Sequence, residues 1–167
     1  MTIKQLAEKE VQLLSLVIKL YHLGDTKETR ESLNSVFVEY NDIFEKYVNL
    51  ANVDDEALKR SLFIQWHQIS EPNWLTGIPE LNQEIEIKLL KILDKRIQND
   101  LLDKELIWMF NYYAKWEYIY ERFPQFPSIN KFVKSVSQVH FPKVINKIEM
   151  VTRGQMGHYW NSLNCFK

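Results

Sequence analysis

The scarcity of glycine is the feature that most constrains how this chain folds. Its 167 residues include only four glycines and five prolines. β-Sandwiches and phosphate-binding loops need many residues that enter tight turns or adopt positive φ angles, and glycine does so most easily. Leu, Ile, Lys, Glu and Gln, which favour helices, are abundant instead. The composition therefore predicts an all-α protein.

The spacing of apolar residues supports the same fold class, because they recur every three to four positions along most of the chain. We expect long helices at about residues 2–23, 25–51, 56–70, 79–98 and 103–123, followed by two or three short ones. The second has the clearest apolar stripe: Leu33, Phe37, Tyr40, Phe44, Tyr47 and Ala51. Short connections favour antiparallel neighbours, so the prediction is an irregular, mostly antiparallel helical bundle.

The predicted helix at 103–123 is apolar on nearly every face. Trp108, Phe110, Tyr113 and Trp116 are among its aromatic residues. A helix without a polar face is usually a buried one. We therefore expect this helix to lie at the centre, with the other helices packed around it.

The length fits one domain over residues 1–167, with a main bundle at 1–123 and a C-terminal helical layer at 124–167. The charge is uneven along this domain. Residues 1–127 carry 15 basic and 21 acidic side chains, a balance of −6. Residues 128–167 carry six basic side chains and one acidic, a balance of +5, which gives −1 for the whole chain.

Cysteine content and hydropathy indicate the compartment. A single cysteine, Cys165, excludes a disulfide within the chain and suits a reducing environment. The charged first residues do not resemble a signal peptide, and no apolar run reaches the roughly 18 residues that a membrane helix needs. We expect a soluble, cytoplasmic protein with no membrane partner.

The sequence contains none of the short motifs that identify common metal or nucleotide sites. It has no cysteine pair, no His-Glu-x-x-His or Glu-x-x-His, no Gly-x-Gly-x-x-Gly and no Gly-Lys-Ser/Thr. We therefore expect no metal and no cofactor. Enzymes with helical folds exist, but these absences favour a protein without catalytic activity.

The segment after the third predicted helix contains the candidate binding residues Trp66, His67, Glu71 and Trp74. His67 and Glu71 are four residues apart, so on a helix they share a face and could share a proton or supply two metal ligands. We favour the simpler interpretation, in which Trp66 and Trp74 pack the loop onto the bundle and His67 lies on the surface.

Two acids interrupt apolar stripes. Glu10 lies between Ala7 and Leu14 on the first predicted helix, and Glu117 lies between aromatic residues on the fifth. A buried carboxylate has a raised pKa unless it is paired, and perturbed acids are candidates for function. Exposure at a helix edge or pairing within the core is the favoured alternative. We expect Glu117 to be the less exposed of the two.

The basic C-terminal segment contains the candidate anion-binding residues Lys131, Lys134, Lys143, Lys147 and Arg153. Cations interleaved with aromatic residues suit single-stranded nucleic acid or another anionic partner. The favoured alternative is that the segment packs on the acidic remainder of the chain.

The last candidate binding residues, His158, Tyr159 and Trp160, belong to an apolar tail. We expect this tail to dock on its own bundle rather than in a partner.

These observations do not identify one function, and three classes remain open. A non-catalytic interaction or scaffold protein, with a protein partner or a second copy of itself, is favoured. An anion or nucleic-acid binder would gather the C-terminal cations on one exposed face. A small-ligand binder or enzyme would have an aromatic-lined pocket where Glu117, His67 or His158 meet Trp and Tyr side chains.

Overall fold

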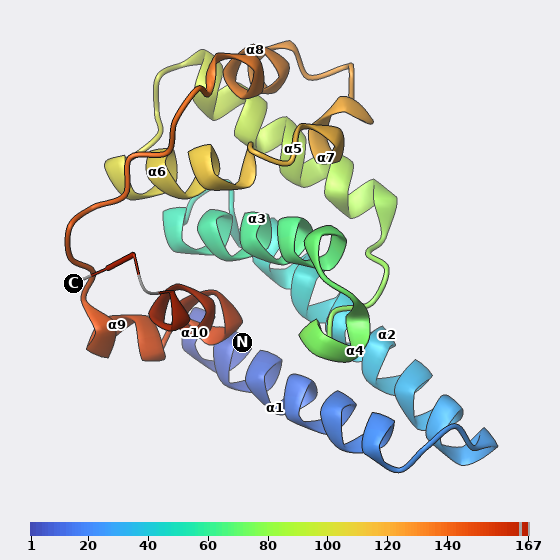
Figure 1. Ribbon diagram of the computed structural model, residues 1–167. Helices are drawn as coiled ribbons and strands as arrows, with labels where there is room; N and C mark the ends of the chain where they lie inside the picture. Colours follow the sequence, from blue (N-terminus) through green and yellow to red (C-terminus); the bar gives the residue numbers. More distant parts are fainter. Residues whose placement is uncertain (164, 167) are drawn as a thin grey trace.

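The computed structural model describes residues 1–163 and 165–166, and this part of the chain contains ten helices and no strand (Figure 1). The all-α prediction is confirmed. The helices are α1 (Ile3–His22), α2 (Lys27–Leu50), α3 (Asp55–Ser70), α4 (Asn73–Thr76), α5 (Gln83–Gln98), α6 (Lys104–Tyr113), α7 (Glu117–Glu121), α8 (Pro127–Ser135), α9 (Lys147–Val151) and α10 (Gly154–Ser162).

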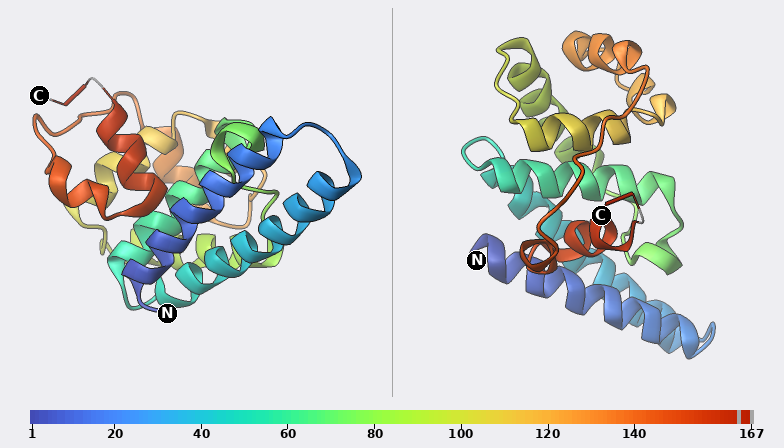
Figure 2. Two further views of the ribbon diagram at one scale, coloured as in Figure 1. Left: turned by 90° about the horizontal axis from the view of Figure 1, so that it is seen from below. Right: turned by 60° about the vertical axis from the view of Figure 1, so that its left-hand side comes forward.

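Helix α3 lies in the middle of the arrangement. An antiparallel hairpin of α1 and α2 runs along one side of it, and α5, α6, α7 and α8 lie on the other (Figures 1 and 2). The last two helices return to the hairpin, where α10 packs against both α1 and α3. None of the described helices has the length and hydropathy of a membrane span.

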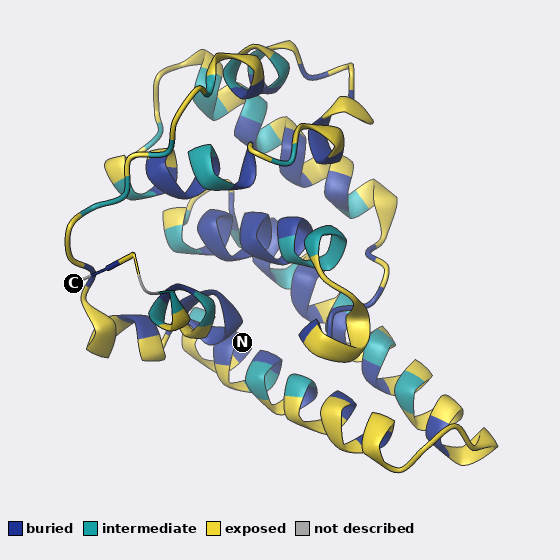
Figure 3. Ribbon diagram, in the orientation of Figure 1, coloured by how far each residue is buried: buried dark blue, intermediate teal, exposed yellow. Residues whose placement is uncertain are grey.

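The centre of the fold differs from the one expected from the sequence. Ten consecutive residues of α3, Ala57–Trp66, are all buried (Figure 3). The prediction that residues 103–123 form the central helix is wrong. That segment is broken between α6 and α7, and Ile107 and Tyr118 face solvent on the two pieces.

Buried charges explain why α3 does not look like a core helix in the sequence. The Lys59 ammonium contacts Asp103 at 2.6 Å and Glu105 at 2.8 Å, and the Arg60 guanidinium donates to Glu56 at 2.7 Å. A buried charge is tolerated when it is paired and hydrogen-bonded. These partners allow α3 to be enclosed on every side although it carries charged residues.

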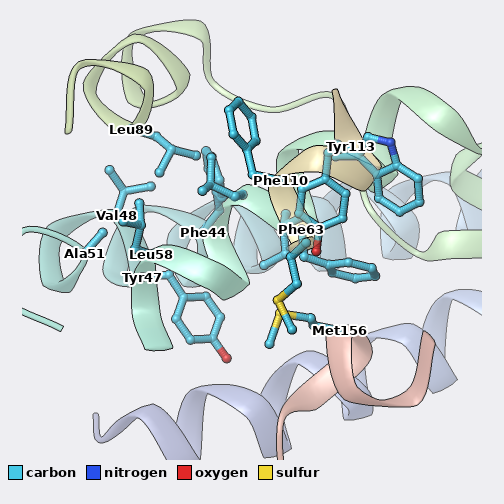
Figure 4. Packing of buried hydrophobic residues seen from close by; sticks show 14 of the residues in the cluster. Phe44, Tyr47, Val48, Ala51, Leu58, Phe63, Leu89, Phe110, Tyr113 and Met156 are labelled. Atoms are coloured by element: carbon cyan, nitrogen blue, oxygen red, sulfur yellow. The ribbon is translucent and has the colours of Figure 1, made fainter. Parts of the chain in front are cut away.

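The hydrophobic core extends through all the layers of the molecule. Of the predicted stripe, Tyr40, Phe44 and Tyr47 on α2 and Ala51 directly after it are completely buried. The labelled core side chains of Figure 4 come from α2, α3, α5, α6 and α10 and the residue after α2: Phe44, Tyr47, Val48, Ala51, Leu58, Phe63, Leu89, Phe110, Tyr113 and Met156.

Helix α5 begins later than Pro79, where the sequence predicts its fourth helix to begin. Asn82 is its N-cap, and its side-chain oxygen accepts hydrogen bonds from the backbone N–H groups of Glu84 and Ile85. The short α4 ends at Gly77, whose φ of +69° favours glycine. Residues 77–82 are therefore a connecting loop.

Candidate functional site

An aromatic cluster brings together four of the predicted binding residues. Trp66 is buried, with Tyr113 stacked on it at 4.9 Å between ring centroids. Tyr159 approaches Trp66 at 5.3 Å, and Trp160 lies against Tyr113 at 5.9 Å. The prediction that the tail docks on its own bundle is confirmed for this region, because Trp160 is completely buried.

His67 is part of this cluster rather than a free surface residue. Its ring stacks on Trp66 at 5.4 Å and 14°, and it approaches Phe63 and Tyr159. Burial lowers the pKa of His67 to about 4, so the imidazole is neutral at pH 7. Glu71 is exposed, and the described residues contain no group of three side chains that could hold a metal ion.

Trp74 does not pack the loop onto the bundle, so that prediction is wrong. Its side chain is 57% exposed, and its neighbour Leu75 is 51% exposed. Helix α4 is held to α1 through the hydroxyl of Tyr21, which donates to the side-chain oxygen of Asn73 at 3.0 Å. The two apolar side chains therefore lie on a part of the surface that is fixed to the fold.

The two acids have the opposite order of burial from the one predicted. Glu117 is exposed at the start of α7, whereas Glu10 is only 1% exposed. The break after α6 explains the difference, because it turns Glu117 away from the helix face predicted for it. His158 is also exposed, so of Glu117, His67 and His158 only His67 lies among Trp and Tyr side chains.

Glu10 is held by groups from two other helices. It accepts hydrogen bonds from the backbone N–H of Gln155 at 2.8 Å and from the hydroxyl of Tyr47 at 3.1 Å. Burial raises the pKa of Glu10 to about 7, although both hydrogen bonds favour the ionised form. Gly154 leaves space for the carboxylate, since a Cβ on that residue would lie 2.7 Å from Oε2 of Glu10.

Arg153 is a structural residue, not an exposed anion site. Its Nε atom donates to Glu56 at 2.8 Å, and its Nη1 atom donates to Glu105 at 2.8 Å. The Nη2 atom donates to both carboxylates. Burial alone would raise the pKa of Glu105, but Arg153 and Lys59 hold it below its usual value. The guanidinium is thus fully engaged within the chain.

The other predicted anion-binding residues do not form one surface. Lys131 and Lys134 are exposed on α8, whereas Lys143 and Lys147 are exposed next to or on α9. In Figure 1, α8 lies at the top of the molecule and α9 at the lower left. The clustering that an anion or nucleic-acid binder would require is therefore not found among the described residues.

A cleft of about 640 Å³ lies where α3, α5 and α7 meet, a volume in the range of small-molecule sites. The end of α3, the residues around the 77–82 loop, the first turn of α5 and the end of α7 form its walls. The lining residues are Gln68, Ile69, Asn73, Ile78, Glu80, Leu81, Gln83, Glu86, Arg122 and Phe123.

Glu86 is the buried charged group of this cleft, with 5% of its surface exposed. Its Oε1 atom accepts hydrogen bonds from Arg122 at 2.7 Å and from the side-chain amide of Gln65 at 3.4 Å. Burial raises the pKa of Glu86, and the nearby negative charge of Glu80 raises it further. The positive charge of Arg122 and the two hydrogen bonds lower the pKa by a smaller amount. The site thus places an acid with a perturbed pKa on the wall of a cleft.

Sequence reasoning missed Glu86, because the pattern that identified Glu10 is only half present. Glu86 precedes Leu90 and Leu93 by four and seven positions, but the positions three and four before it are the polar Gln83 and Asn82. Glu10 has apolar residues on both sides. Arg122 has no comparable pattern, because its role depends on a contact across 36 residues of sequence.

Comparison with known protein families, with curated proteins and with solved structures found no match.

Proposed function

We propose that this protein is a non-catalytic binding protein that holds a small polar molecule in the cleft between α3, α5 and α7. The observation that carries the proposal is the buried Glu86 on the wall of a 640 Å³ cleft. Buried charges are costly, and in a cleft they provide a strong polar anchor for a ligand.

The other residues of the cleft suit binding rather than covalent chemistry. Apart from the carboxylates of Glu80 and Glu86, its lining contains no side chain of the kinds that act as nucleophiles. The amide side chains of Gln68, Asn73 and Gln83 instead offer both donors and acceptors. Such amide groups recognise the shape and polarity of a ligand, which supports binding as the role of the cleft.

A fragment screen followed by two-dimensional amide NMR tests this proposal. Bound fragments should shift the backbone amide signals of the cleft residues, including Gln83 and Phe123. The variant Gln83→Trp places an indole at the edge of the cleft and should abolish these shifts. Lys91→Trp, an exposed position on the same helix outside the cleft, is the matched control.

The outcomes of this screen are distinct. Shifts that persist in Gln83→Trp would place the fragments elsewhere and contradict the proposal. A library that leaves every cleft amide unchanged would contradict it as well. The proposal is supported if the amide shifts disappear in Gln83→Trp and remain in Lys91→Trp.

A second candidate function is self-association through α4, which keeps open the interaction role predicted from the sequence. It is favoured by the exposure of Trp74 and Leu75 beside Tyr21. Large exposed apolar side chains mark interaction surfaces, and Trp is enriched among residues that dominate binding energy. We propose a homodimer in which these side chains are buried.

Light scattering at increasing protein concentration tests the dimer. The molecular mass of the wild type should approach twice that of the monomer as the concentration rises. The variant Trp74→Ser should keep the mass of the monomer. Tyr118→Ser, which alters an aromatic residue of similar exposure on α7, should have no effect. A monomer at every concentration would exclude the dimer.

We also propose a cytoplasmic location. Its support is the single cysteine, Cys165, which is free and exposed and therefore suits a reducing compartment. Fractionation of the source cells with an antibody to the protein tests the location, and recovery outside the cytoplasmic fraction would contradict it.

A further inference from the structure

The charge of the cleft points to the kind of ligand that it accepts. Three lining residues are charged: Glu80, Glu86 and Arg122. Two carboxylates and one guanidinium leave the lining one negative charge in excess when all three are ionised. A cationic group is therefore a better electrostatic match than an anionic one.

Arg122 is already occupied in a way that lowers its value as an anion site. One terminal nitrogen of its guanidinium donates to Oε1 of Glu86 at 2.7 Å, and Nε donates to the carbonyl oxygen of Ile119 at 3.2 Å. The group also lies over the ring of Phe123, 4.8 Å from its centroid. The charges of Arg122 and Glu86 therefore offset each other, and the excess negative charge of the lining is that of Glu80.

Two acceptor atoms at Glu86 and Gln65 have no hydrogen-bond partner within the described part of the chain. Among the described residues, no hydrogen bond reaches Oε2 of Glu86, and the buried Oε1 of Gln65 next to it has no partner either. A carboxylate that is nine-tenths buried normally has its oxygens hydrogen-bonded. Oε2 of Glu86 is thus free to accept a hydrogen bond from a ligand, and an ammonium group supplies three donors.

Apolar side chains complete the site. Ile78, Leu81 and Phe123 are buried residues that border the cleft, and Ile69 is half-buried beside them. They offer a surface for a short hydrocarbon stem. A charged head beside an apolar stem is the chemistry of an alkylammonium compound.

We infer that the cleft binds a small molecule through an alkylammonium group, which the carboxylates of Glu86 and Glu80 hold while its alkyl stem lies against Leu81 and Phe123. This inference rests on the proposed binding function and specifies the class of ligand. It assigns Glu86 as the main anchor, because its carboxylate is the more buried of the two.

Three probes of equal length isolate the charge of the head group: n-pentylammonium, 1-pentanol and pentanoate. Each is added at matched millimolar concentrations, and the amide signals of Gln83, Glu86 and Phe123 are followed by NMR. We expect saturable shifts with n-pentylammonium, and binding of the other two that is weaker by about tenfold or more, equivalent to about 1.4 kcal/mol.

Three variants test the assigned residues. Glu86→Gln should weaken n-pentylammonium binding by about tenfold or more, and Glu80→Gln by a smaller factor, since an exposed charge contributes less than a buried one. Glu84→Gln, which removes an exposed acid of α5 outside the cleft lining, is the matched control. Glu80 is exposed, so its variant stays informative even where Glu86→Gln lowers stability.

The possible results separate the ligand class from the binding function itself. Preferential binding of pentanoate or pentanol at the cleft would overturn the alkylammonium assignment and leave the binding function standing. Equal weakening by Glu80→Gln and Glu84→Gln would also overturn it. Absence of any cleft shift with these probes, while other fragments bind there, would overturn the ligand class alone.

Discussion

The carboxylate of Glu10 on α1 accepts a hydrogen bond from the backbone N–H of Gln155, the second residue of α10, at 2.8 Å. The two residues are 145 positions apart in the sequence. A carboxylate near a helix N-terminus satisfies a free N–H group and interacts favourably with the helix dipole. One buried acid thus joins the first helix of the chain to the last.

Replacing Glu10 by glutamine should change how stability depends on pH. Burial raises the pKa of Glu10 from 4.5 to about 7, so the folded protein binds more protons than the unfolded chain between these values. This contribution to stability is complete below pH 4.5 and is lost as the pH rises to 7. Relative to Glu10→Gln, the wild type should lose about 3 kcal/mol over this range, measured by urea unfolding.

The comparison between the two proteins isolates Glu10 from its neighbours. Tyr47 and Arg60 do not change charge in this range, and Glu56, which pairs with Arg60, is present in both proteins. Identical pH profiles for the wild type and the variant would show that Glu10 titrates normally in the folded state.

The imidazole of His67 should have the opposite effect on the pH profile. Burial lowers its pKa from 6.5 to about 4, so the unfolded chain binds the extra proton between these values and stability rises with pH. His67→Phe keeps a ring against Trp66 and removes this contribution. Its stability should therefore fall more steeply than that of the wild type between pH 4.5 and 6.5.

A control variant at an exposed histidine, His140→Gln, should keep the wild-type profile. Because the effects of Glu10 and His67 oppose each other in the wild type, the slope of its profile should lie between those of the two variants. A wild-type slope outside that interval would show that one of the two shifts is absent.

An alanine at Gly154 should destabilise the protein more than an alanine at Gly24. Both glycines have positive φ angles, +62° and +88°, so each substitution carries a backbone cost of about 1 kcal/mol. At Gly154 the new Cβ would also lie 2.7 Å from Oε2 of Glu10, whereas at Gly24 it would meet nothing within 4 Å. We expect a loss of about 3 kcal/mol at Gly154 in denaturant unfolding. Equal losses at the two positions would mean that Glu10 moves aside freely.

The substitution Arg153→Lys should lower stability by about 3 kcal/mol, because lysine cannot bind two carboxylates with a planar group. Glu56 and Glu105 would then be left incompletely paired in a partly buried site. Lys147→Ala, at an exposed position on the neighbouring helix, should change stability by less than about 0.5 kcal/mol. A tolerated Arg153→Lys, measured by thermal and urea unfolding, would show that the ion pairs are dispensable.

The helix content and the core face of α2 could be predicted from the sequence because they depend on local patterns. The alternation of apolar and polar residues fixes which face of a helix is buried, and it identified Tyr40, Phe44 and Tyr47 correctly. The burial of Trp66 and Trp160 agrees with the expectations that Trp66 packs on the bundle and that the apolar tail docks on it.

The failures occurred where burial depends on a partner far along the chain. Lys59 and Arg60 hid the central place of α3, because their burial depends on contacts with Asp103, Glu105 and Glu56. Conversely, the apolar segment at 103–123 looked central, but it is broken before Glu117.

By itself, therefore, the sequence determined that this chain is helical and where most of its helices lie, since these properties depend on residues three to five positions apart. The tertiary structure decided which helix is central, which acid is buried and where the cleft forms. Each of these depends on pairing between distant groups, such as Glu10 with Gln155 and Glu86 with Arg122. Local periodicity contains no information about such partners, because it records only the neighbours on one helix.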